Sequence, residues 1–285
     1  MVRRARHRAS VASPSWRTTA AQLGEIGGQT GQEMDDVGAI TERGGYVFIQ
    51  AKLRLRLGEH AGSPLAEALD QAVRQFIEGA PPGPDGNRRR LEPGRDALVI
   101  CTDAATPASV RNDLRNVVTR LASHGQGLPL DQVAKNPGER RALKVLLVHL
   151  RDAFAKQTSG TPPSEEQLRE IGRLLHVITL DVDPGGVDRN AAETHHRGVL
   201  DDPATAPGAW NDLVTLGQLL SERRRWANRN DVRHALASGG HPAGIDPPFK
   251  DDVRRLREVT RAALDGNARE VTIPVPEGCR RPPRT

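Results

Sequence analysis

The sequence is poor in cysteine and in aromatic residues. Among its 285 residues, Cys101 and Cys279 are the two cysteines, and neither has a second Cys or a His at the spacing of a metal-ligand pair. This argues against both a disulfide framework and a zinc site. Aromatic residues make up 3% of the chain, which is too few for stacking on nucleic-acid bases to be a main mode of binding.

Long apolar runs are also missing. No run approaches the roughly 20 apolar residues that span a bilayer. The basic start, MVRRARHRAS, is not followed by the apolar stretch of about 7–15 residues that a secretion signal requires. With 36% hydrophobic and 27% charged residues, the composition is that of a globular protein. We therefore expect a soluble, cytoplasmic protein with no membrane partner.

The charge balance alone does not identify a partner. The net charge is +5, from 41 Lys and Arg against 36 Asp and Glu. A surplus of this size is compatible with a polyanion such as nucleic acid but does not establish one.

The chain divides into regions of different composition. Residues 1–28 are Arg- and Ser-rich and then Gly-rich, which predicts a loosely ordered segment with at most a short helix over 17–25. Residues 29–125 alternate between strand-like and helix-like patterns. Residues 126–269 are predominantly helical in pattern, and residues 270–285 predict one more strand and a tail.

The α/β region begins with a predicted hairpin. Residues 37–40 read as a strand, Gly44-Gly45 as the tight turn, and residues 46–57 as a longer strand. Ser63 and Pro64 then start an amphipathic helix over 65–79, because Ser is a favoured N-cap and Pro a favoured first helical residue. The apolar run 97–102 predicts a strand buried on both faces.

The later pattern predicts helices separated by Pro- and Gly-rich joints. They are expected over 108–123, 138–157, 164–177, 208–238 (broken near Asn228–Asn230) and 249–265. The expected fold class is therefore an α/β domain followed by an all-helical domain.

Three polar residues are expected to meet at one end of the hairpin. Side chains two apart on a strand share a face, so Gln50 and Lys52 point the same way at the end of an otherwise apolar strand. With the turn centred near residues 43–44, Asp36 should lie opposite residue 51 and close to both. Polar groups in such a place are costly unless something compensates them.

A carboxylate, an amide oxygen and an ammonium suit metal-assisted phosphodiester hydrolysis. Mg²⁺ prefers oxygen ligands and usually takes one or two protein carboxylates. Asp36 would be the principal ligand and Gln50 a weaker one, while Lys52 would orient water or stabilise charge on the phosphate. Glu33, just upstream, would add a ligand or manage protons.

The stretch from Asp36 to Gln50-Ala51-Lys52 resembles the PD-(D/E)xK nuclease superfamily. The order hairpin, helix, strand is similar to its αβββαβ core. More narrowly, Asp-Asp-Val, a strand, Gln-x-Lys and a Gln-containing helix resemble the nuclease domains fused to STAND-type NTPases or to nucleotide-activated effectors in bacterial antiphage systems. The resemblance implies a Mg²⁺-dependent (or Mn²⁺-dependent) endonuclease acting on double-stranded DNA in defence.

Some features depart from the family pattern. Gln50 stands where an acidic residue is usual, and the segment 17–25 is a poor candidate for the family's first helix. No GxxxxGK[ST] motif occurs, so we expect an NTPase or sensor partner, or a homo-oligomer that forms on activation. A catalytically inactive DNA-binding or assembly module, and a nuclease of the restriction or repair type, remain the alternatives.

Four further residues are candidates for DNA contact or support of the site. Gln71 and Gln75 lie four apart on the predicted helix and so share a face. Arg54 and Arg56 would extend the strand face of Lys52, where contact with phosphate would make binding fall steeply with salt.

Overall fold

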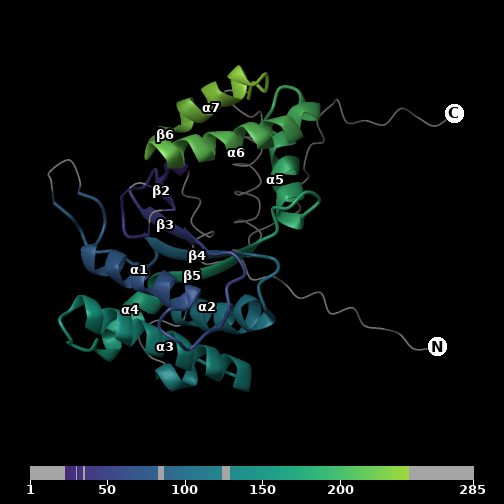
Figure 1. Cartoon of the computed structure of the whole chain (residues 1–285). Helices are drawn as coiled ribbons and strands as arrows, with labels where there is room; N and C mark the ends of the chain where they lie inside the picture. The colour runs from purple at the N-terminus through teal and green to yellow at the C-terminus, as the bar shows by residue number, and fades with distance from the viewer. Residues whose placement is uncertain (1–22, 30, 35, 83–86, 124–128, 244–285) are drawn as a thin grey trace, which may run out of the picture.

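The computed structural model describes residues 23–29, 31–34, 36–82, 87–123 and 129–243. These form a mixed α/β fold around a six-stranded sheet with the strand order β5-β4-β3-β2-β1-β6 (Figure 1). The strands are β1 (Leu23–Gly28), β2 (Val37–Thr41), β3 (Tyr46–Ala51), β4 (Ala97–Asp103), β5 (Leu175–Leu180) and β6 (Trp226–Asn228). The α-helices are α1 (Pro64–Glu78), α2 (Arg115–Ser123), α3 (Pro137–Gln157), α4 (Glu165–Leu174), α5 (Val187–Arg197), α6 (Ala206–Arg223) and α7 (Arg229–Ser238).

The sheet is antiparallel on one side and parallel on the other. The pairs β6–β1, β1–β2 and β2–β3 are antiparallel, whereas the pairs β3–β4 and β4–β5 are parallel. A π-helical turn over Ser109–Leu114 leads directly into α2, and short 3₁₀ turns lie at Leu130–Gln132 and Pro203–Thr205. The expected mixed α/β class is confirmed.

Local sequence signals explain the hairpin and α1. The turn between β2 and β3 closes with Thr41 N–H donating to the Gly45 carbonyl at 2.9 Å, and Gly44 adopts φ +70°, where glycine is favoured. Ser63 caps α1 by accepting a hydrogen bond from Ala66 N–H at 3.2 Å, and Pro64 is the first helical residue.

The main core lies between one face of the sheet and the helices α1 to α4, which Figure 1 shows gathered on one side. Phe48, Leu98 and Ile100 bring β3 and β4 into this core, and Leu175 adds β5. A smaller apolar cluster lies among α6, α7 and the turn before α6 (Leu200, Ala206, Ala209 and Leu236).

The region expected to be all-helical contributes strands, so that expectation is wrong. The helix expected over 164–177 ends at Leu174, and the chain continues as β5 beside β4. The apolar run that follows Leu174 suits either a buried helix or a buried strand, and its β-branched residues favour the strand. The expected break near Asn228–Asn230 is present as β6. Both the sheet and its core therefore extend across residue 125.

Two expectations near the N-terminus also need correction. Residues 23–28 form β1 rather than a loose segment or a helix. The long strand expected over 46–57 ends at Ala51; Arg54 adopts φ +50°, and Leu53 is 81% exposed. The helix expected over 249–265 and the strand near 270–276 lie outside the described residues. Among the helices that are described, none is both long enough and apolar enough to cross a membrane.

Candidate functional site

Asp36 and Gln50 meet at the open end of the β2–β3 hairpin. The last pair of the ladder is Val37 with Ile49, and one further step sets Asp36 against Gln50. Asp36 Oδ2 accepts hydrogen bonds from Gln50 Nε2 and from the Ala51 backbone N–H, the latter at 2.8 Å. The register is thus one residue away from the expected pairing with residue 51, but the predicted meeting of acid and amide occurs.

Gln50 is a buried amide with an unused acceptor. Its side chain lies on the core side of β3, as that of Phe48 does, and the residue is 4% exposed. Its Oε1 has no hydrogen-bond partner among the described residues. A buried acceptor without a partner costs about 1–3 kcal/mol, so the fold alone does not account for this oxygen.

Lys52 continues the same edge but contacts a residue that the sequence pattern does not single out. Its backbone N–H donates to the Cys101 carbonyl at 2.9 Å, which extends the pairing of β3 with β4. Its ammonium lies 3.7 Å from a carboxylate oxygen of Glu67, in the first turn of α1. An acidic residue is common at a helix start, so no sequence signal marks Glu67 as special.

Three residues of α1 form a stripe beside this site. Glu67, Gln71 and Gln75 follow one another at intervals of four, which places them on one helix face. Glu67 reaches Lys52 at one end of the stripe. In the middle, Gln71 Oε1 is buried and, like that of Gln50, lacks a partner among the described residues.

Gln75 holds the chain that leads to Asp36. Its Oε1 accepts from Glu33 N–H at 3.0 Å and from Met34 N–H at 3.4 Å, and its Nε2 donates to the Gly79 carbonyl at 2.8 Å. The residue is 0% exposed. Of the two predicted roles for Gln75, its burial therefore favours support of the site over DNA contact.

The side chain of Glu33 is engaged elsewhere. Its carboxylate lies 2.5 Å from Arg74 Nη1, and Arg74 Nε lies 3.3 Å from Asp70 on the same helix. The structure therefore brings Asp36 and Gln50 into contact and places the Glu33 carboxylate against Arg74 instead. Arg74 was not predicted, because its partner lies 41 residues away in sequence.

Arg54 and Arg56 do not extend the face of Lys52, because β3 has already ended. Both side chains are exposed, and Arg54 N–H donates to Asp103 Oδ1 at 3.2 Å at the end of β4. The two arginines do lie near the ends of β3 and β4, but the prediction that they share a strand face with Lys52 is wrong.

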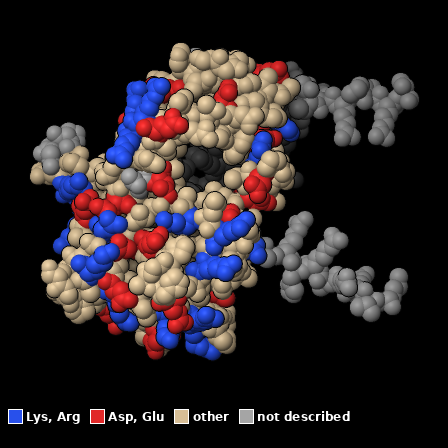
Figure 2. Space-filling model, viewed as in Figure 1, with Lys and Arg blue, Asp and Glu red and all other residues tan. Residues whose placement is uncertain are grey.

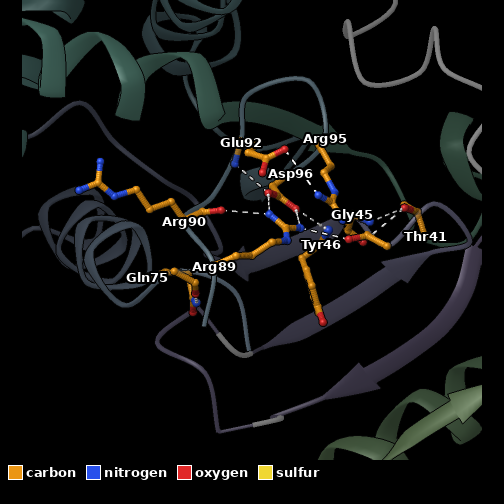
Figure 3. Close-up of polar contacts among 11 residues, drawn as sticks. Thr41, Gly45, Tyr46, Gln75, Arg89, Arg90, Glu92, Arg95 and Asp96 are labelled. Carbon is orange, nitrogen blue, oxygen red and sulfur yellow. Dashed lines mark hydrogen bonds and ion pairs between the residues drawn. The ribbon is translucent and has the colours of Figure 1, made fainter. Parts of the chain in front are cut away.

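The opposite end of the hairpin carries a carboxylate with a full set of donors (Figure 3). The Asp96 side chain is 0% exposed and accepts from the backbone N–H groups of Tyr46 and Glu92, each at 2.8 Å. Arg89 donates to both carboxylate oxygens, at 2.5 and 2.7 Å, and to the Gly44 carbonyl at 3.0 Å. The hydrogen bond with Asp96 raises the pKa of Arg89.

Within the described part of the chain, no group of three or more His, Cys, Asp or Glu side chains is arranged to hold a metal ion. A cation at the hairpin end would therefore have one carboxylate and amide oxygens as its protein ligands. Mg²⁺ accepts such a set, since it keeps several waters and completes its shell with substrate phosphates.

No family model, no curated protein and no solved structure matches the chain. Its function is therefore inferred from the residues that meet at the hairpin end.

Proposed function

We propose that this protein is a Mg²⁺-dependent DNA endonuclease in which Asp36, Gln50 and Lys52 form the centre of the active site. The observation that carries the proposal is the contact of Asp36 with Gln50, whose buried amide oxygen has no hydrogen-bond partner among the described residues. The element order from β1 to β4, three antiparallel strands, a helix and a strand parallel to the third, agrees with the PD-(D/E)xK core. The core's first helix would fall before Leu23, outside the described residues.

The donor atoms at this end suit Mg²⁺ or Mn²⁺. Asp36 supplies a carboxylate whose Oδ2 is oriented by Ala51 N–H, and Gln50 supplies Oε1 once its amide faces the ion. Glu33 would join them only after leaving Arg74. When bound, the ion polarises a phosphate and lowers the pKa of a bound water.

Lys52 supplies the positive charge that faces the phosphate. Its backbone is fixed to β4 through the Cys101 carbonyl, while its ammonium pairs, within the described part of the chain, with the exposed Glu67 carboxylate. Exposed ion pairs are weak, about 0–1 kcal/mol, so a phosphate oxygen can replace Glu67 as the partner. The ammonium then donates to the oxygen on which negative charge develops.

One observation favours the rival, a DNA-binding or assembly module without catalysis. With Glu33 held by Arg74, Asp36 is the one acidic side chain that the described contacts place beside Gln50. A single carboxylate gives weaker metal binding than two. If the protein is an active nuclease, its resemblance implies a role in antiphage defence, with an NTPase, a sensor protein or a second copy of the chain as partner. A nuclease of the restriction or repair type is the alternative.

Cleavage of supercoiled plasmid in Mg²⁺ or Mn²⁺ tests the proposal. We expect Asp36→Asn and Lys52→Met each to reduce the cleavage rate roughly 100-fold or more, the size found when one charge-stabilising group is removed. The matched control is Asp131→Asn, an exposed carboxylate on the turn before α3, which should cleave as the wild type does. Equal cleavage by all four proteins would remove this site, and binding of the plasmid without cleavage would support the rival.

A further inference from the structure

The sheet register places the end of α6 at the same edge as the proposed active site. Gly27 of β1 pairs on one side with Gly38 of β2 and on the other with Trp226 of β6. Gly38 in turn pairs with Phe48 of β3. Trp226 and Phe48 therefore stand at the same level of the sheet, two residues before the level of Gln50.

The residues immediately before Trp226 are Arg223, Arg224 and Arg225. Because β1 and β6 are antiparallel, stepping back from Trp226 to Arg225 moves in the same direction as stepping from Gly27 to Gly28. That direction continues to Gln29, whose N–H lies 3.4 Å from the Asp36 carbonyl oxygen. The arginines, which precede β6, therefore lie at the same edge of the sheet as Asp36, which precedes β2. Because β6 and β2 are two strand spacings apart, the distance between the two positions is about 10 Å.

Close packing fixes this helix end against the sheet. A Cβ added to Gly28 would lie 2.3 Å from Ser221 Oγ, and one added to Gly38 would lie 2.7 Å from the Trp226 ring. Arg224 adopts φ +49° and ends α6, and Arg225 N–H donates to the Leu220 carbonyl at 3.0 Å. The backbone that carries the arginines is therefore held in place, and its position does not depend on a loop.

The three arginine side chains are exposed. None has an ion-pair partner among the described residues, although the exposed carboxylate of Glu222 precedes them in the chain. Arg74 and Arg89, by contrast, are committed to carboxylates within the fold. Figure 2 shows Lys and Arg side chains gathered at the end of α6 that leads into β6.

We propose that Arg223, Arg224 and Arg225 bind the phosphate backbone of a DNA duplex that lies across this edge of the sheet. The choice of DNA rests on the proposed function. Successive phosphates of one strand are about 3.4 Å apart along the duplex axis, so a separation of about 10 Å places the arginine contacts about three nucleotides from the phosphate at Asp36. Arginine suits this role, since its guanidinium contacts phosphate with two donors at once.

The test compares two double variants that remove the same charge. The first variant, Arg223→Gln with Arg225→Gln, removes two positive charges from this edge of the sheet. Arg224 is left unchanged because its backbone is in the left-handed region. Arg140→Gln with Lys144→Gln removes two exposed cations from α3, which lies across α1 from the sheet. Binding of a short fluorescent duplex is measured by anisotropy in EDTA, which prevents cleavage, over a salt series.

Each phosphate contact contributes about 0.9 to the slope of log K against log salt. We expect the edge variant to lower the magnitude of that slope by about 1.8 and to weaken binding roughly tenfold or more near 100 mM salt. The α3 variant should keep the wild-type slope. Equal slopes for the two double variants would show that Arg223 and Arg225 do not contact the phosphates of the duplex.

Asp36→Asn in the same assays separates this inference from the proposed function. If the edge variant binds as the wild type does while Asp36→Asn abolishes cleavage, the surface is wrong and the nuclease stands. If the edge variant loses binding while Asp36→Asn cleaves normally, the surface stands and the proposed catalytic site is wrong. Absence of duplex binding by the wild type would overturn both.

Discussion

Each end of the β2–β3 hairpin holds a carboxylate, and the two carboxylates differ in burial and in their hydrogen-bond donors. At the turn end, Asp96 is wholly buried and has two backbone N–H donors together with the guanidinium of Arg89. At the open end, Asp36 is half-buried, with the Gln50 amide and one backbone N–H as its donors. A stable fold tolerates a buried charge when hydrogen bonds and an opposite charge compensate it. A partly exposed carboxylate with fewer donors can still bind a metal ion or a substrate.

Two buried glutamines repeat the contrast. Both amide groups lie in the interior, but Gln75 uses its oxygen and its nitrogen within the protein, whereas the oxygen of Gln50 has no partner among the described residues. Natural proteins keep such local conflicts mainly at functional sites. The difference between the two ends therefore separates residues that build the hairpin from residues that are placed for a substrate.

The largest effect on stability is expected for Asp96→Asn. The substitution keeps the shape but removes the charge that Arg89 faces, and breaking a buried pair in this way costs about 3–5 kcal/mol. Chemical denaturation should show that loss in the free energy of unfolding. Asp36→Asn is the matched change at the open end and should cost less than about 1 kcal/mol, because water reaches its carboxylate. Equal losses for the two variants would abolish the contrast.

A third carboxylate extends the comparison into the helical layer. Glu139 at the start of α3 is contacted by Arg120, and it also accepts from Lys135 N–H at 2.7 Å. The hydrogen bond with Arg120 lowers its pKa from 4.5 to about 2. Its contribution to stability is therefore fully present above pH 4.5 and is lost as the pH falls toward 2.

Glu139→Gln should expose this contribution as a pH-dependent difference. We expect the variant to be less stable than the wild type by about 3 kcal/mol at neutral pH, and the two proteins to converge as the pH falls from about 4.5 toward 2. Urea unfolding curves at several pH values measure the difference. A constant gap across that range would show that the ionisation of Glu139 does not carry the difference in stability.

The sequence predicted the elements whose signals are local. The Ser63-Pro64 start of α1, the glycine turn and the buried run of β4 were all expected close to where they occur. It missed β1 and β5, because each of these strands is held by pairing with residues far away in the chain, β1 with β6 and β5 with β4. The extension of β3 to Leu57 failed because the alternation of apolar residues continues in the sequence after the backbone has left the sheet at Ala51.

The candidate site divides in the same way. The i, i+2 rule placed Gln50 and Lys52 together at the end of β3, and the hairpin brought Asp36 to Gln50, while the Lys52 ammonium lies beside Glu67. Glu67 and Arg74 could not be predicted, since their roles follow from the position of α1 against the end of β3 and against the loop before Asp36. Tertiary packing, which no short motif encodes, determines both.

The smallest effect on stability is expected for Gln50→Met. Methionine fills a similar volume and removes the buried oxygen that lacks a partner, but it also removes the Nε2 donor to Asp36, and the two effects oppose each other. The free energy of unfolding should therefore change by less than about 1 kcal/mol, which corresponds to a change in Tm of no more than about 2–4 °C. Gln75→Met makes the same replacement at the satisfied amide, and it should lower Tm because Glu33 N–H and the Gly79 carbonyl lose their partner. Scanning calorimetry of the two variants decides the point. A decrease in Tm for Gln50→Met as large as that for Gln75→Met would make Gln50 a structural residue, whereas a nearly unchanged Tm combined with loss of plasmid cleavage would show that Gln50 serves function and not stability.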